Sequence, residues 1–91
     1  MTIRHQNIRV AGLVQGVSFR AHTQRQANAI GLTGFVRNES DGSVYIEAEG
    51  QDADLANFVR WCHEGPSMAQ VTTVEVTNGP IVNFRDFRIT G

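Results

Sequence analysis

Short segments of the chain alternate between hydrophobic and polar residues, which is the pattern of β-strands with one buried face. In the first of them, residues 7–14, one face holds Ile8, Val10, Gly12 and Val14 and the other holds Asn7, Arg9, Ala11 and Leu13. Two more strands are expected at residues 32–38 and 43–49. Asp41 and Gly42 lie between them and favour the positive φ angles of a tight turn, so these strands should form a hairpin.

Two other segments carry hydrophobic residues at helical spacing. We expect Ser18 to cap the first helix, which ends at Gly31 and has a repeating face of Phe19, Thr23, Ala27 and Ile30. Asp52 is suited to cap the second helix, whose apolar stripe is Leu55, Phe58, Val59 and Cys62. Gly65 and Pro66 then break the helical pattern.

The remaining segments with strand character are residues 71–77 and 86–90, which complete the order β-α-β-β-α-β with a possible short extra strand. This order predicts an α+β fold of the ferredoxin-like type, a split βαβ sandwich in which two helices cover one face of an antiparallel sheet. A chain of 91 residues without repeats or linkers is the size of one domain, so we expect residues 1–91 to form a single domain.

Composition narrows the kinds of partner and compartment. Eight arginines, no lysine and nine acidic residues give a net charge of -1, which argues against charge-driven binding to nucleic acid or to an anionic membrane. Cys62 is the only cysteine and therefore has no internal disulfide partner. No segment approaches the ~20 apolar residues of a membrane span or resembles a signal peptide. We therefore expect a soluble, cytoplasmic protein. A domain this small with no surplus apolar stripe is expected to be a monomer.

Residues 12–20 have the character of an anion-binding segment, because they lead from a strand through a glycine turn into the start of a helix. The first amides of a helix have no partner inside it and lie at the positive end of its dipole. Gly16 allows the backbone to approach a ligand, and Arg20 in the first turn is unfavourable for the dipole unless an anion is bound. From this segment alone, a simple tight turn with a solvated arginine is an equally good interpretation.

Several other phosphate chemistries do not fit the sequence. The loop lacks the Gly-Lys-Ser/Thr end of a nucleotide-binding loop, and it holds no cysteine that could act as a nucleophile. Cys62 lies in the apolar stripe of the second helix, where core packing is the expected role. His5, His22 and His63 are scattered over different elements, so neither a metal nor another cofactor is expected.

Taken together, several motifs resemble those of the acylphosphatases. They are Gly-Leu-Val-Gln-Gly-Val-Ser-Phe-Arg at 12–20, Gly-Phe-Val-Arg-Asn at 34–38, Asp-Gly-Ser-Val at 41–44, Gly50, Gly-Pro at 65–66 and the strand at 69–76. The resemblance implies an enzyme that hydrolyses the carboxyl-phosphate anhydride of small acyl phosphates without a metal. It also implies a phosphate cradle made by the Arg20 guanidinium and the backbone of Gln15, Gly16, Val17, Ser18 and Phe19. In the family pattern, Asn38 would orient the attacking water. Without the resemblance, Asn38 would be interpreted as a turn residue ahead of the hairpin.

The chain departs from the family pattern at two places. Ala21 and His22 stand where relatives often carry bulky aromatic residues, and the sequence closes with Thr90 and Gly91 where many relatives have an aromatic residue. These departures bear on how firmly Arg20 is supported. They leave both implied functional side chains in place, and the sequence does not specify which acyl phosphate is the substrate.

Three alternatives use the same architecture. An RNA-binding module would stack bases on aromatic residues of the sheet, where we expect only Tyr45 to be well placed. A metal-transfer domain would need a Cys-x-x-Cys pair after the first strand, and residues 14–18 contain no cysteine. A catalytically idle, phosphate-binding regulatory domain remains open, although the presence of both Arg20 and Asn38 argues against it.

Overall fold

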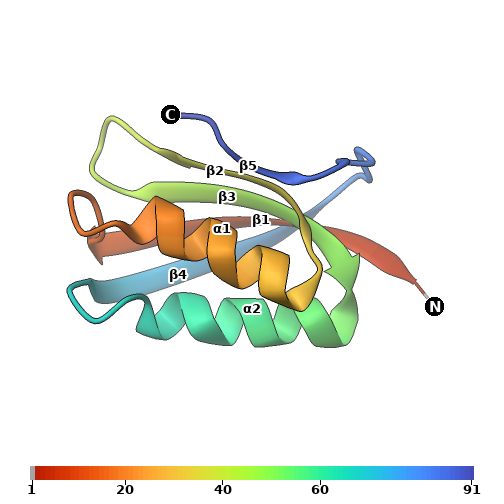
Figure 1. Ribbon diagram of the computed structural model, residues 1–91, viewed down its shortest axis with the longest axis horizontal. Coiled ribbons are helices and arrows are strands. Elements are labelled where there is room, and N and C mark those ends of the chain that lie inside the picture. Colours follow the sequence, from red (N-terminus) through yellow and green to blue (C-terminus); the bar gives the residue numbers. More distant parts are fainter. Residues whose placement is uncertain (1) are drawn as a thin grey trace.

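The secondary structure follows the expected order and includes the short extra strand at the end. The computed structural model describes residues 2–91 and is shown in Figure 1. Its elements are β1 (Ile3–Leu13), α1 (Phe19–Ile30), β2 (Thr33–Asn38), β3 (Val44–Gln51), α2 (Asp52–Glu64), β4 (Gln70–Gly79) and β5 (Phe87–Ile89). None of the helices in this part of the chain is both long and apolar enough to cross a membrane.

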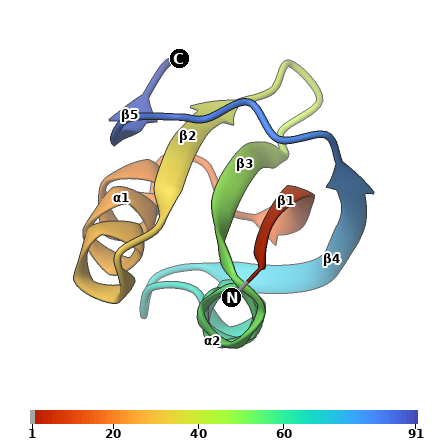
Figure 2. The same cartoon turned by 90° about the vertical axis from the view of Figure 1, so that its right-hand side faces the viewer.

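The strands form one sheet in the order β4-β1-β3-β2-β5. The pairs β1–β3, β1–β4 and β2–β3 are antiparallel, while β5 runs parallel to β2. Both helices lie on the same face of the sheet (Figure 2). The predicted ferredoxin-like α+β fold is therefore confirmed, and the extra strand makes the sheet mixed at one edge instead of wholly antiparallel.

The core lies between the sheet and the two helices. Even-numbered residues of the central strands, such as Ile8, Val10 and Ile46, are fully buried, as the alternating pattern predicts. The helices cover them with the buried residues Phe19, Thr23, Ala27, Leu55, Phe58 and Cys62. Burial raises the pKa of the Cys62 thiol to about 12, so this cysteine is a packing residue, as expected.

Both predicted helix caps need correction. Ser18 does precede α1, but its backbone is left-handed, with φ 61°, and its side chain makes no capping hydrogen bond. The residue preceding α2 is Gln51, and Asp52 is already the first helical residue. Asp52 and Asp54 nevertheless lie in the first turn, where their charge complements the helix dipole.

The sheet face away from the helices is more aromatic than the sequence indicated. Tyr45 lies on this face, as expected, but Phe35 lies beside it with ring centroids 6.0 Å apart, and Phe84 packs edge-on against Phe35 at 5.8 Å. The expectation that Tyr45 alone is well placed there is therefore wrong. Arg37 covers the Tyr45 ring at 4.8 Å and also contacts Glu39, so this surface is occupied by contacts within the chain.

Candidate active site

The loop between β1 and α1, residues 14–18, is held at both ends by buried side chains. Val14 and Phe19 are each 1% exposed and belong to the core. Between them, Gly16 has φ 75° and its α-carbon faces open space, while Ser18 has φ 61°. Positive φ at these two positions bends the chain sharply, and a bend between two anchors produces a loop whose backbone is exposed.

The amides of this loop are available to a ligand. Within residues 2–91, the backbone N–H groups of residues 15–20 have no hydrogen-bond acceptor. The first helical bond joins the His22 amide to the Ser18 carbonyl oxygen at 3.1 Å. These free donors lie at the positive end of the α1 dipole, which makes the loop suited to an anion.

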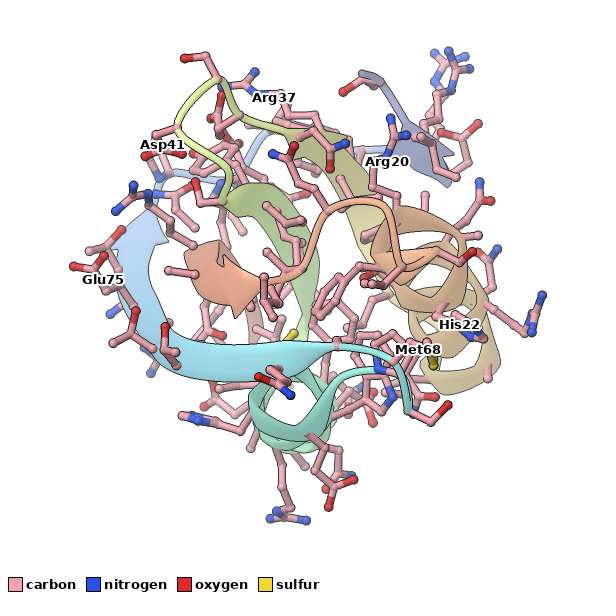
Figure 3. All side chains as sticks on the ribbon, turned by 90° about the vertical axis from the view of Figure 1, so that its left-hand side faces the viewer. Arg20, His22, Arg37, Asp41, Met68 and Glu75 are labelled. Carbon is pink, nitrogen blue, oxygen red and sulfur yellow. The ribbon has the colours of Figure 1, made fainter. Side chains whose placement is uncertain are left out.

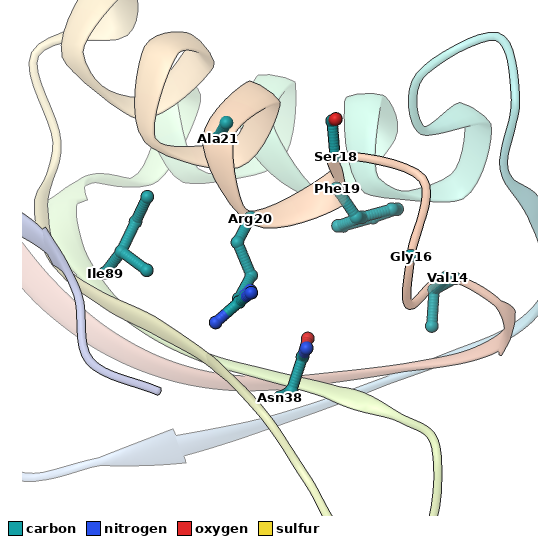
Figure 4. A pocket seen from close by; sticks show the side chains of 8 residues that line it. All are labelled: Val14, Gly16, Ser18, Phe19, Arg20, Ala21, Asn38 and Ile89. Carbon is teal, nitrogen blue, oxygen red and sulfur yellow. The ribbon is translucent and has the colours of Figure 1, made fainter.

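Arg20 and Asn38 meet at a pocket of about 430 Å³ beside this loop. Figure 3 shows Arg20 at the end of the molecule where the loop and the β2–β3 hairpin lie. In Figure 4, Arg20 extends from α1 and Asn38 extends from β2 into the same space. The residues that line the pocket are Val14, Gly16, Ser18, Phe19, Arg20, Ala21, Asn38 and Ile89.

The Gly91 carbonyl oxygen connects the two functional candidates. It accepts a hydrogen bond from Nη1 of Arg20 and another from the backbone amide of Asn38, the latter at 3.1 Å. The Thr90 amide in turn donates to the Val36 carbonyl oxygen at 2.9 Å, so the segment after β5 continues to lie along β2. The guanidinium of Arg20 is thereby held beside Asn38.

Oδ1 of Asn38 is buried and has no hydrogen-bond partner within residues 2–91. Leaving a buried acceptor unsatisfied costs about 1–3 kcal/mol, so an unpaired Oδ1 in this position calls for an explanation. The Asn38 amide points from β2 toward the loop (Figure 4), and an acceptor in that position is suited to a hydrogen bond from a ligand or a water molecule.

The residues predicted to form the cradle differ in how they lie relative to the pocket. Gly16, Ser18, Phe19 and Arg20 line the pocket, whereas Gln15 and Val17 do not. The Gln15 side chain turns toward the β2–β3 hairpin, and Val17 packs against the core. The side chain of Ser18 extends away from Arg20 and Asn38, so only its backbone is placed to act in the cradle (Figure 4).

The sequence interpretation did not select Val14, Ala21, Ile89 or Gly91. Val14 and Ala21 immediately flank the predicted cradle and could have been included on that ground. Ile89 and Gly91 come from the far end of the chain, and only the departure from the family pattern at Thr90 and Gly91 had connected that end with the support of Arg20. Among residues 2–91, no group of three or more His, Cys, Asp and Glu side chains is placed to hold a metal ion.

Comparison with known proteins decides the family to which this site belongs. The family model described as Acylphosphatase matches residues 6–89. This chain belongs to the acylphosphatase family. An acylphosphatase of Marinobacter nauticus is 47% identical over 91 residues, covering 99% of both chains. One from a Nocardioides species is 46% identical over 83 residues, which is 91% of this chain and 84% of that protein.

A solved structure extends the likeness to three dimensions. The crystal structure of acylphosphatase from Bacillus subtilis superimposes with a TM-score of 0.94 at 35% identity, covering 99% of this chain and 100% of that one. The resemblance inferred from the motifs is thus confirmed over nearly the whole acylphosphatase chain. Membership of this family does not favour the alternative of a catalytically idle regulatory domain.

Proposed function

We propose that this acylphosphatase hydrolyses the carboxyl-phosphate anhydride of small acyl phosphates by in-line attack of a water molecule held by Asn38. The phosphate would be held by Arg20 and by the backbone of Gln15, Gly16, Val17, Ser18, Phe19 and Arg20. The observation that carries the proposal is the convergence of Arg20 and Asn38, from two different elements, on one pocket bordered by free amides.

The phosphate half of the site has the donors that a phosphoryl group needs. Arg20 supplies a planar guanidinium, and the loop supplies amides that have no hydrogen-bond acceptor within residues 2–91. In phosphoryl transfer the negative charge lies mainly on three equatorial oxygens, and donors fixed in advance stabilise it through the transition state. Arg20 and the loop amides would provide most of the electrostatic stabilisation.

Asn38 supplies the other half of the reaction, which is placement of the nucleophile. Its buried Oδ1 has no partner among the described residues 2–91 and its amide nitrogen is a donor, so the side chain can orient a water molecule. A carboxamide is not a base at neutral pH. We therefore assign the proton of the attacking water to the substrate's own phosphate oxygen, and Asn38 acts through position alone.

The leaving group explains why so few side chains suffice. Hydrolysis breaks the bond between phosphorus and the bridging oxygen and releases a carboxylate, whose conjugate acid has a pKa near ~4. Such a group departs without protonation, so the site needs no general acid. A phosphate monoester would release a far more basic alkoxide, and we expect it to react poorly here.

We extend the proposal to the state of the protein. Residues 1–91 would act as one domain, as a monomer in the cytoplasm. The net charge of -1 argues against a nucleic acid or an anionic membrane as the partner. Light scattering of the purified protein tests the monomer, and localisation of a tagged chain tests the compartment.

The first experiment is hydrolysis of benzoyl phosphate by the purified protein, with and without excess chelator. An aryl phosphate monoester is the matched substrate control. We expect the protein to hydrolyse the acyl phosphate rapidly and to leave the monoester unchanged. The chelator should not change the rate for the acyl phosphate. No turnover by a well-folded wild type would instead favour the phosphate-binding regulatory domain, and loss of activity with chelator would contradict the metal-independent mechanism.

A further inference from the structure

The side chain of Gln15 joins the phosphate loop to the hairpin that follows Asn38. Its Nε2 donates to the Glu39 carbonyl oxygen at 2.7 Å and to the Ser43 carbonyl oxygen at 2.9 Å. A carboxamide nitrogen carries two hydrogens, so both are used. One side chain thus connects the two segments from which the site is built.

The hairpin that accepts these bonds is itself tightly closed. The Glu39 amide donates to the Ser43 carbonyl oxygen at 2.8 Å, and the Asp41 carboxylate accepts from the Ser43 amide at 2.9 Å and from Ser43 Oγ at 2.6 Å. The two hydrogen bonds from Ser43, with a further one from Arg9, lower the pKa of Asp41 to about 2. Asn38 directly precedes this closed turn in the chain.

Asn38 is therefore positioned from two sides. On one side its own amide donates to the Gly91 carbonyl oxygen, which also holds Arg20. On the other side the adjacent Glu39 is held by Gln15. The first contact sets Asn38 relative to the guanidinium, and the second sets it relative to the loop amides.

We propose that the Gln15 side chain is a positioning residue that fixes the hairpin carrying Asn38 against the phosphate loop. This inference rests on the proposed function and adds a role for a side chain that the family resemblance used only through its backbone. In-line attack depends steeply on geometry, and a misplacement of about 1 Å can cost about 100-fold in rate. Loss of the Gln15 bonds should therefore slow the chemical step more than it weakens phosphate binding.

The test is Gln15→Met, which keeps the length of the side chain and removes both donors. We expect kcat for benzoyl phosphate to fall about tenfold or more, while the inhibition constant of inorganic phosphate changes less than about threefold. Gln15→Asn is a second variant, which keeps the amide but is too short to span both carbonyls, and it should show the same split. Each variant is assayed at a temperature where circular dichroism shows it to be folded.

Thr77→Val is the matched control. Thr77 Oγ1 accepts a hydrogen bond from Asn7 Nδ2 at 3.4 Å, which also joins distant segments, and neither residue lines the pocket. The variant removes one side-chain hydrogen bond between segments, yet kcat should stay within about twofold of wild type. This contrast separates positioning of Asn38 from a general effect of losing one hydrogen bond between distant segments.

Two results would overturn the inference. One is a kcat within about twofold of wild type in both Gln15 variants, and the other is a parallel loss of kcat and phosphate affinity, which would place Gln15 in the cradle. Hydrogen exchange of the Glu39 amide reports on the hairpin without any turnover and should be faster in Gln15→Met. Failure of the wild type to hydrolyse benzoyl phosphate would instead overturn the proposed function.

Discussion

At the scale of single residues, Arg20 and Asn38 carry different parts of the proposed reaction, so substitutions should separate them. Asn38→Ala should lower kcat by about 100-fold or more and leave the inhibition constant of inorganic phosphate within about threefold. Arg20→Gln should lower both kcat and the affinity for phosphate. The inhibition constant of inorganic phosphate should rise by about tenfold or more because a charged donor is lost. Steady-state kinetics with benzoyl phosphate and phosphate as competitor measure both constants.

Arg25→Gln provides the control for charge on α1, since Arg25 is exposed on the same helix and is not among the residues that line the pocket. It should behave as wild type. An Asn38→Ala protein that kept most of its rate would show that the water-holding role is wrong. An Arg20→Gln protein that bound phosphate normally would place the cradle in the backbone alone.

At the scale of elements, the end of β1 decides where the phosphate loop begins. The β1–β4 register shifts between Ala11 and Gly12, and Gly12 has φ 131°. A β-carbon added to Gly12 would lie 2.1 Å from the Gln70 carbonyl oxygen. The bulge therefore requires glycine both for its φ angle and for the close approach of β4.

We expect Gly12→Ala to lower the free energy of unfolding by about 2 kcal/mol or more, because strain and a backbone clash act together. The shift of the loop should also weaken inhibition by phosphate. Gly42→Ala is the control, since Gly42 has φ 94° but nothing within 4 Å of the added carbon, and about 1 kcal/mol is expected. Urea unfolding compares the two, and equal losses would show that the close approach of β4 is unimportant.

At the scale of the whole molecule, the connection from β4 to β5 crosses the open face of the sheet and is anchored at its centre (Figure 2). The buried Glu49 carboxylate on β3 accepts from the amides of Val82 at 2.5 Å, Asn83 at 2.9 Å and Phe84 at 3.2 Å. Nδ1 of the buried His5 lies 2.8 Å from the same carboxylate. This anchor holds the segment that leads to Ile89 and Gly91 at the site.

The anchor should make stability depend on pH. Burial disfavours the charged forms of His5 and Glu49, but their hydrogen bonds and charged neighbours outweigh the effect of burial. The hydrogen bonds to Glu49 and Asn7, and the charges of Glu47 and Glu49, raise the pKa of His5 above its ordinary 6.5. The Val82 amide, His5 and the next two loop amides lower the pKa of Glu49 below its ordinary 4.5. His5 therefore stabilises fully below about pH 6.5 and loses this effect as the pH rises through its folded-state pKa.

Glu49 stabilises fully above about pH 4.5 and loses its effect as the pH falls through its folded-state pKa. The combined contribution is therefore greatest between about pH 4.5 and 6.5. Urea unfolding from about pH 3 to 9 should show that Glu49→Gln costs about 3 kcal/mol in this window. His5→Gln should remove the decline on the alkaline side, whereas the exposed His63→Gln should not. A wild-type profile parallel to that of His5→Gln would contradict this account.

The order of elements was predictable because each depends on residues close together in the chain. Local strand character marked β2 and β3 to within two residues, in β3 through alternation with a period of two, and spacing of three and four marked the buried faces of both helices. The predictions were wrong where a contact between elements competes with local preference. β5 pairs parallel with β2, Ser18 adopts a left-handed conformation without capping, and Phe84 reaches the open face beside Tyr45 and Phe35 only because the crossing segment carries it there.

The site shows the same difference between features set by neighbouring residues and features set by contacts between distant segments. By itself the sequence determined the glycine turn into α1, the motifs shared with acylphosphatases and the two candidate side chains, because these lie within short stretches of chain. Only the tertiary structure decided that Gly91 lies against Arg20, 71 residues away, that Gln15 holds a hairpin 24 residues away, and that Glu49 anchors a loop 33 residues away. Such contacts follow from how the strands order themselves in the sheet, which is a property of the folded chain as a whole and of no single segment.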